Sequence, residues 1–152
     1  PVYPVEELLL GGMVTGRIAA ALGRGFAANS AGTTFNGLTG AGPLGQKVAN
    51  TFRSGTYTEL TTGETTTLYR VWGGKSNQIG PYWTRVEPTG PVQSILDSAL
   101  NPAWGNTATK VVKIEVPAGV KIYEGVAAPQ GGLVGGGNQI FIPKVDPKWI
   151  VK

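Results

Sequence analysis

The sequence predicts a small α+β domain with a twisted, mainly antiparallel sheet and one or two short helices. Short runs of β-branched and aromatic residues recur after residue 50, and 24 glycines and 11 prolines supply turns between them. One segment in that part of the chain has the apolar spacing of a helix face. Hydrophobic residues make up 41% of the chain and charged residues 14%, which is the composition of a folded domain.

Residues 1–50 are predicted to form a separate N-terminal segment, because they are rich in glycine and alanine and poor in charge. We expect one or two short helices there, followed by a loose linker over residues 33–45. No apolar run approaches the roughly 20 residues that span a bilayer, so stable membrane insertion is not expected. The segment either links the domain to a larger parent protein or helps it to cross a membrane.

Residues 51–152 are predicted to form the catalytic domain, and its first strands are expected at residues 65–72 and 82–86. The first run is rich in threonine and aromatic residues and ends at two glycines; the second ends before Pro88. A helix is expected over residues 92–100, because apolar side chains recur there at intervals of three and four.

Three further strands are expected in the last part of the chain. Residues 110–116 and 120–125 are β-branched runs, and the turn Pro117-Ala118-Gly119 joins them. The last strand covers residues 139–142 and is entered from three consecutive glycines. Residues 147–150 close the chain.

The sequence contains no cysteine and no histidine. Their absence excludes Ser-His-Asp and Cys-His catalysis, disulfide bonds and the common zinc sites, so no metal or other cofactor is expected. Any chemistry must use Arg, Lys, Asp, Glu, Gln, Ser, Thr or Tyr. The net charge of +4 and the pI of about 9.5 favour an anionic partner, such as a nucleotide, RNA or an acidic inhibitor protein.

Arg70 is a charged residue within an otherwise hydrophobic strand. Burial of a guanidinium is costly unless it is paired, and a diphosphate could receive two parallel hydrogen bonds from it. Alternatively, Arg70 faces solvent on the polar side of an alternating strand.

Tyr82 and Trp83 follow the glycine-containing loop Gly80-Pro81 and precede Thr84. Neighbouring residues of a strand face opposite sides, so one ring can join the core while the other lines a pocket. An exposed ring is a stacking surface for nicotinamide or adenine. Thr84 could add a hydroxyl donor to such a pocket.

Residues 135–137 are three consecutive glycines, followed by Asn138 and Gln139. Glycine runs are expected where the backbone approaches a ligand closely or adopts positive φ, so we expect Gly136 and Gly137 to contact a substrate. A buried Gln139 amide needs hydrogen-bonding partners, which a substrate could supply. The alternative is a flexible hairpin loop.

In this order, residues 112–117, 125–130 and 135–139 resemble the C-terminal part of tuberculosis necrotizing toxin domains, in which a strand leads to a Gly-x-x-Ala-Pro segment and a Gly-Gly-Gly-x-Gln motif. The wider region 65–152 is similar to the toxic C-terminal tips of filamentous haemagglutinin-type and contact-dependent growth inhibition proteins. The resemblance covers about residues 60–152. It departs from the family pattern by a longer spacing between Arg70 and the aromatic residues.

The resemblance implies an ADP-ribosyltransferase-like fold that hydrolyses NAD⁺ to nicotinamide and ADP-ribose, with NAD⁺ as substrate. Arg70 would match the phosphate-binding arginine, Tyr82 or Trp83 the aromatic residue, and Gln139 the glutamine. It further implies a large secreted or cell-surface parent protein, action in the target-cell cytoplasm, and a tight 1:1 heterodimer with a cognate immunity protein.

Two other functions are compatible with the composition. The first is a tRNA-cleaving toxin, which would use basic residues to bind phosphates. The second is a non-enzymatic binding module. The acidic residues Glu115, Glu124 and Asp97 are expected on solvated faces. The basic residues that the ribonuclease would use are Arg70, Arg85, Lys110, Lys113 and Lys144.

Overall fold

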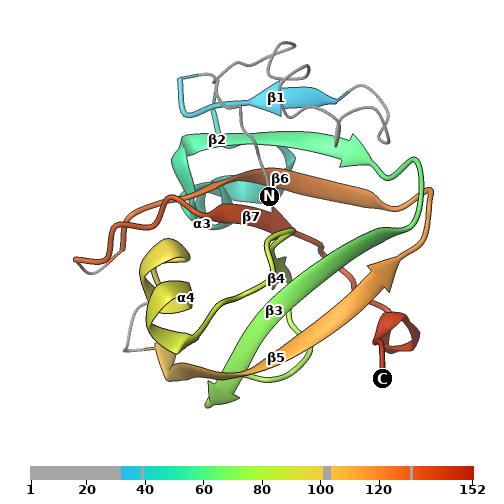
Figure 1. Ribbon diagram of the computed structural model, residues 1–152. Helices are drawn as coiled ribbons and strands as arrows, with labels where there is room; N and C mark the ends of the chain where they lie inside the picture. Colours follow the sequence, from blue (N-terminus) through green and yellow to red (C-terminus); the bar gives the residue numbers. More distant parts are fainter. Residues whose placement is uncertain (1–31, 39, 101–103, 131) are drawn as a thin grey trace.

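The computed structural model describes residues 32–38, 40–100, 104–130 and 132–152 (Figure 1). Its fold is mixed α+β with antiparallel sheets and two short helices, as the sequence predicted. The helices expected in the Gly/Ala-rich start of the chain lie outside the described residues. Within the described part, no helix is long and apolar enough to cross a membrane.

A five-stranded antiparallel sheet forms one layer of the molecule. Two of its strands, β1 and β2, were not predicted individually, and β1 lies within the segment expected to be a linker. Strand β2 carries a register shift between Phe52 and Tyr57, where Ser54 and Gly55 have positive φ. In spatial order the strands are β1 (Thr33–Phe35), β2 (Phe52–Thr61), β6 (Lys121–Ala127), β7 (Asn138–Phe141) and β4 (Tyr82–Trp83).

A long two-stranded ribbon of β3 (Thr66–Gly74) and β5 (Asn106–Val116) crosses this sheet (Figure 1). Alternate residues of β5 are buried, which is the period-2 pattern of a strand with one face on a core. Tyr69 of β3 and Thr84 exchange two backbone hydrogen bonds of 2.8 Å, which join the ribbon to the sheet next to β4. The main core contains Leu60, Leu68, Trp83, Val112, Ile114, Val116, Ile122, Ile140 and Ile142.

The α-helices are α3 (Gly45–Ala49) and α4 (Pro91–Asp97), and 3-10 turns cover Gly42–Leu44 and Pro147–Trp149. Helix α4 matches the predicted helix but ends earlier, because Ala99 takes a left-handed φ of 49°. Pro91 occupies the first turn, where its missing N–H costs no helical hydrogen bond.

A second hydrophobic cluster lies around Tyr57 of β2 and attaches α3 to the sheet. It contains Ala49, Phe52 and Tyr123, with Phe35 and Leu44 packed against it. The Tyr57 hydroxyl donates to the Ala41 carbonyl at 2.5 Å and accepts from the Leu44 N–H at 3.2 Å. The described residues from β1 to α3 thus pack on the same sheet as the later strands.

Candidate functional site

A cavity of about 830 Å³ lies between β3, β4, β7, α3 and α4. This volume is within the usual range for small-molecule sites. Six of the seven site residues predicted from the sequence contribute to its wall, and Gly136 does not. The six are Arg70, Tyr82, Trp83, Thr84, Gly137 and Gln139.

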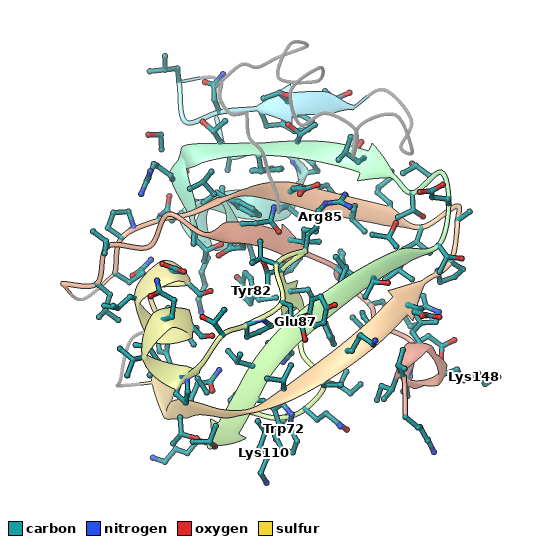
Figure 2. All side chains as sticks on the ribbon, viewed as in Figure 1. Trp72, Tyr82, Arg85, Glu87, Lys110 and Lys148 are labelled. Carbon is teal, nitrogen blue, oxygen red and sulfur yellow. The ribbon has the colours of Figure 1, made fainter. Side chains whose placement is uncertain are left out.

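Tyr82 and Trp83 face opposite sides of β4, as alternation requires. Trp83 is only 3% exposed, belongs to the main core, and donates its indole N–H to the Gly80 carbonyl at 2.7 Å. The Tyr82 ring is half-buried and meets Phe141 edge-on at a centroid distance of 5.2 Å. Figure 2 shows Tyr82 between β7 and α4. Tyr82 is therefore the ring of this pair that a ligand can contact.

The Gln139 side chain is 9% exposed and is held by a threonine that the sequence analysis did not identify. Gln139 Nε2 donates to Thr51 Oγ1 at 2.9 Å, and the Thr51 hydroxyl donates to the Val48 carbonyl at 2.6 Å. Since the hydroxyl proton is committed to Val48, the amide group that meets Thr51 must be the donor. Oε1 of Gln139 accepts no hydrogen bond from the described residues and is available to a ligand.

Thr51 also lies beside the Tyr82 phenol. Burial raises the pKa of Tyr82 above its ordinary value of 10.0 and outweighs the opposite effect of the neighbouring Thr51 side chain. Tyr82 is therefore a neutral phenol at physiological pH. One threonine, placed by the turn between α3 and β2, links the ring and the amide.

Arg70 is part-buried, and its guanidinium orders the loop that leads to β4. Nε donates to the Asn77 carbonyl, Nη1 to the Tyr82 carbonyl and Nη2 to Ser76 Oγ, each at 3.2 Å. The absence of a side chain at Gly80 makes room for it, because a Cβ there would lie 2.4 Å from Nη2. Three of its five N–H donors are thus used within the protein.

Burial lowers the pKa of Arg70 from 12.5, but a guanidinium stays charged at neutral pH. Among the described residues, no carboxylate forms an ion pair with it. Its charge is therefore uncompensated next to the cavity, and two N–H groups are left for an anion.

Thr84 and Asn138, which both line the cavity, belong to a hydrogen-bonded network. Asn138 Oδ1 accepts from the Thr84 hydroxyl at 3.3 Å and from the Arg85 N–H at 2.8 Å. Glu124 accepts from Asn138 Nδ2 at 2.7 Å and forms a two-bonded ion pair with Arg85 at 2.8 and 2.9 Å. The expectation of a solvated Glu124 is thus wrong, and the Thr84 hydroxyl is directed to Asn138.

The glycine run lies against the end of helix α4. The N–H groups of Gly135 and Gly137 donate to the carbonyls of Leu96 and Asp97 at 2.9 and 2.8 Å, and Gly136 donates to Ala127 at 2.9 Å. Carbonyls at the end of a helix lack partners within it, and the run supplies them. The N–H of Gly136 is used by Ala127 and is not free to donate to a substrate, and Gly136 does not line the cavity. Gly137 does line the cavity.

The cavity wall carries both signs of charge. Lys47 and Arg70 contribute positive charge, and Glu87 and Asp97 contribute negative charge. Lys47 makes no ion pair or hydrogen bond with the described residues, so its ammonium is free to meet a ligand. No group of three or more potential metal ligands occurs in the part of the chain that the structure describes.

No protein-family model, curated protein or solved structure matches the chain at a significant level. A functional proposal therefore depends on the residues of this cavity.

Proposed function

We propose that the chain is the toxic domain of a contact-dependent growth inhibition protein and that it hydrolyses NAD⁺ to nicotinamide and ADP-ribose. One observation carries the proposal: Arg70, Tyr82 and Gln139, from three different strands, line one cavity large enough for a dinucleotide. Gln139 belongs to the Gly-Gly-Gly-x-Gln motif that carries the resemblance to the necrotizing toxin domains, and Arg70 and Tyr82 are the residues matched to that family's arginine and aromatic residue. An ADP-ribosyltransferase-like arrangement of the sheets is part of this proposal.

Each of the three groups has a role that its chemistry permits. Arg70 offers a fixed positive charge for the diphosphate, and Lys47 adds a second. The neutral Tyr82 ring provides a stacking face for nicotinamide. Gln139 Oε1 can accept a hydrogen bond from a water molecule or a ribose hydroxyl and so orient it.

The reaction needs no histidine. The bond between ribose C1′ and the nicotinamide nitrogen breaks with its electron pair on the nitrogen, so the leaving group departs neutral and needs no proton. Water oxygen then bonds to C1′ of the oxocarbenium ion, and the released proton goes to solvent. Gln139 cannot take up that proton; its role is to orient the water as positive charge develops.

The proposal includes a partner and a location. A toxin of this class requires an immunity protein in its producer, and a basic chain favours an acidic one in a tight 1:1 complex. We place its binding surface over the mouth of the cavity. The parent protein would be secreted or displayed on the cell surface, for competition between bacteria.

Of the five basic residues expected to bind tRNA, Arg70 lines the cavity and the other four do not. Arg85 is paired with Glu124, and Lys110 lies over the Trp72 ring at 4.7 Å, on the β3–β5 ribbon (Figure 2). Arg85, Lys110, Lys113 and Lys144 are not among the lining residues. The cavity therefore favours NAD⁺ over tRNA as substrate, and the test below includes tRNA.

The test is to incubate the chain with NAD⁺ and, separately, with total tRNA. We expect nicotinamide and ADP-ribose from the first and intact RNA from the second. Gln139→Ala should reduce NAD⁺ hydrolysis at least 100-fold with an unchanged far-ultraviolet spectrum, while Lys113→Ala, outside the cavity, should be fully active. Intact NAD⁺ together with cut tRNA would overturn the proposal.

A further inference from the structure

Trp104 is an exposed aromatic residue at the cavity that none of the roles above uses. Its side chain lines the cavity but is 51% exposed, whereas Trp72 and Trp149 pack against the core. Large apolar surface is normally removed from water, and an indole left open beside a cavity is suited to receive a flat ring.

The backbone that follows Trp104 is held by hydrogen bonds to β3 and its end. The Gly105 carbonyl accepts from the Lys75 N–H at 2.9 Å, and Asn106 Nδ2 donates to the Val71 carbonyl at 3.1 Å. Asn106 Oδ1 in turn accepts from the Ala108 N–H at 2.8 Å. These bonds attach the residues after Trp104 to the end of β3, so the indole has a defined place at the cavity.

Apolar residues line the cavity together with Trp104. Leu100, Val71 and Pro88 contribute to the wall, and all of them lack charge. A nucleobase presents a flat, weakly hydrated face, which stacks well on such a surface. Trp104 is thus an aromatic residue that a ligand can contact, in addition to the half-buried Tyr69 and Tyr82 of the same wall.

We infer that Trp104 is a stacking site for the adenine ring of NAD⁺, while Tyr82 receives the nicotinamide end. The dinucleotide part of this inference depends on the proposed function; the stacking of a planar nucleobase does not, because a base of RNA has the same chemistry. Trp104 then determines whether a mononucleotide or a dinucleotide is preferred.

The kinetic test compares NAD⁺ with nicotinamide mononucleotide, which lacks the adenylate. Trp104→Ala should raise KM for NAD⁺ about 10-fold and leave kcat/KM for the mononucleotide unchanged. Trp104→Phe should retain most of the affinity. Val111 is an equally exposed apolar residue outside the cavity, so Val111→Ala is the control and should leave the kinetic constants for both substrates unchanged. Equal effects of Trp104→Ala on both substrates, or no effect on either, would overturn the inference.

A binding test separates this inference from the proposed function. AMP and ADP-ribose should quench tryptophan fluorescence, and the quenching should disappear in Trp104→Phe. If AMP quenches Trp104 but NAD⁺ is not hydrolysed, the base site stands and the proposed reaction fails. If tRNA quenches the fluorescence but AMP does not, the ligand of Trp104 is an RNA base and not the adenine of NAD⁺, and the inference about NAD⁺ fails. No quenching by any of these ligands would sink the site.

Discussion

The side chains of Gln139 and Thr51, 88 residues apart, form one hydrogen-bonded unit in which Nε2 donates to Oγ1 at 2.9 Å. The Thr51 hydroxyl donates its hydrogen bond to the Val48 carbonyl, so the amide must be the donor toward Thr51. The Gln139 oxygen that can orient a nucleophile is therefore positioned by a residue in the turn that immediately precedes β2.

Thr51→Val should lower kcat for NAD⁺ hydrolysis about 10- to 100-fold with a smaller change in KM, because the amide loses the acceptor that orients it. Leaving a buried donor unpaired should also cost about 1–2 kcal/mol of stability. Thr51→Ser keeps the hydroxyl and should restore kcat. Thr58→Val, which removes an exposed hydroxyl pair between Thr58 of β2 and Thr34 of β1, is the control. A fully active Thr51→Val would show that the amide needs no such support.

Arg70→Lys keeps the charge but should disorder the loop before β4. One ammonium cannot reach the Asn77 carbonyl, the Tyr82 carbonyl and Ser76 Oγ in the fork geometry of a guanidinium. We expect a loss of about 2 kcal/mol in the free energy of unfolding, measured by urea denaturation, together with a rise in KM for NAD⁺. Unchanged stability would contradict the loop-ordering role.

Glu124→Gln should destabilise the wall that carries Asn138, because it removes the charge from the acceptor of the two hydrogen bonds that the part-buried Arg85 donates to Glu124. Since both side chains retain some contact with solvent, we expect about 1–2 kcal/mol rather than the cost of a fully buried pair. Lys121→Ala removes the longer and more exposed pair with Glu59, at 3.9 Å, and should change stability by less than about 0.5 kcal/mol. Equal losses of stability in the two variants would show that the Arg85–Glu124 pair stabilises the fold no more than the Lys121–Glu59 pair does.

Gly135→Ala should loosen helix α4 and impair the cavity. Its φ is +67°, and a Cβ would lie 2.7 Å from the carbonyl oxygens of Ala127 and Ala128. Gly119→Ala is the matched control, with a φ of +90° and open space around the added carbon, and should cost only about 1 kcal/mol for the backbone. We expect a substantially larger loss for Gly135→Ala, measured by thermal unfolding, and slower NAD⁺ hydrolysis.

The pH profile of kcat/KM should be flat from about pH 6 to pH 9. Burial raises the pKa of Tyr82 above its ordinary value of 10.0, so the phenol stays protonated throughout this pH range. The sequence has no histidine that could titrate near neutrality. A bell-shaped profile with an apparent pKa near 7 would point to an acid or base outside the proposed three residues.

Strand β5 was predictable because its alternation is a local property of the sequence. Strand β2 was not, since Ser54 and Gly55 interrupt its pattern with positive φ, and its pairing with β6 joins distant parts of the chain. Alternation predicted that Tyr82 and Trp83 would separate, but only the core determines which of them is buried.

Some features of the site have no pattern in the sequence. Thr51 is an ordinary residue until folding brings Gln139 beside it. The glycine run 135–137 is conspicuous in the sequence, yet close approach to helix α4 explains it as well as approach to a ligand would. Composition indicates that the backbone comes close to something; only the fold identifies what.

The attachment of α3 through Tyr57 has a practical consequence for the smallest fragment worth producing. A polypeptide that starts at Thr51 would retain Arg70, Tyr82 and Gln139, and so all three residues of the proposed catalytic site. It would nevertheless lack the helix that supplies Lys47 and the acceptor carbonyl of Val48. Expression boundaries for activity assays therefore belong upstream of Thr33.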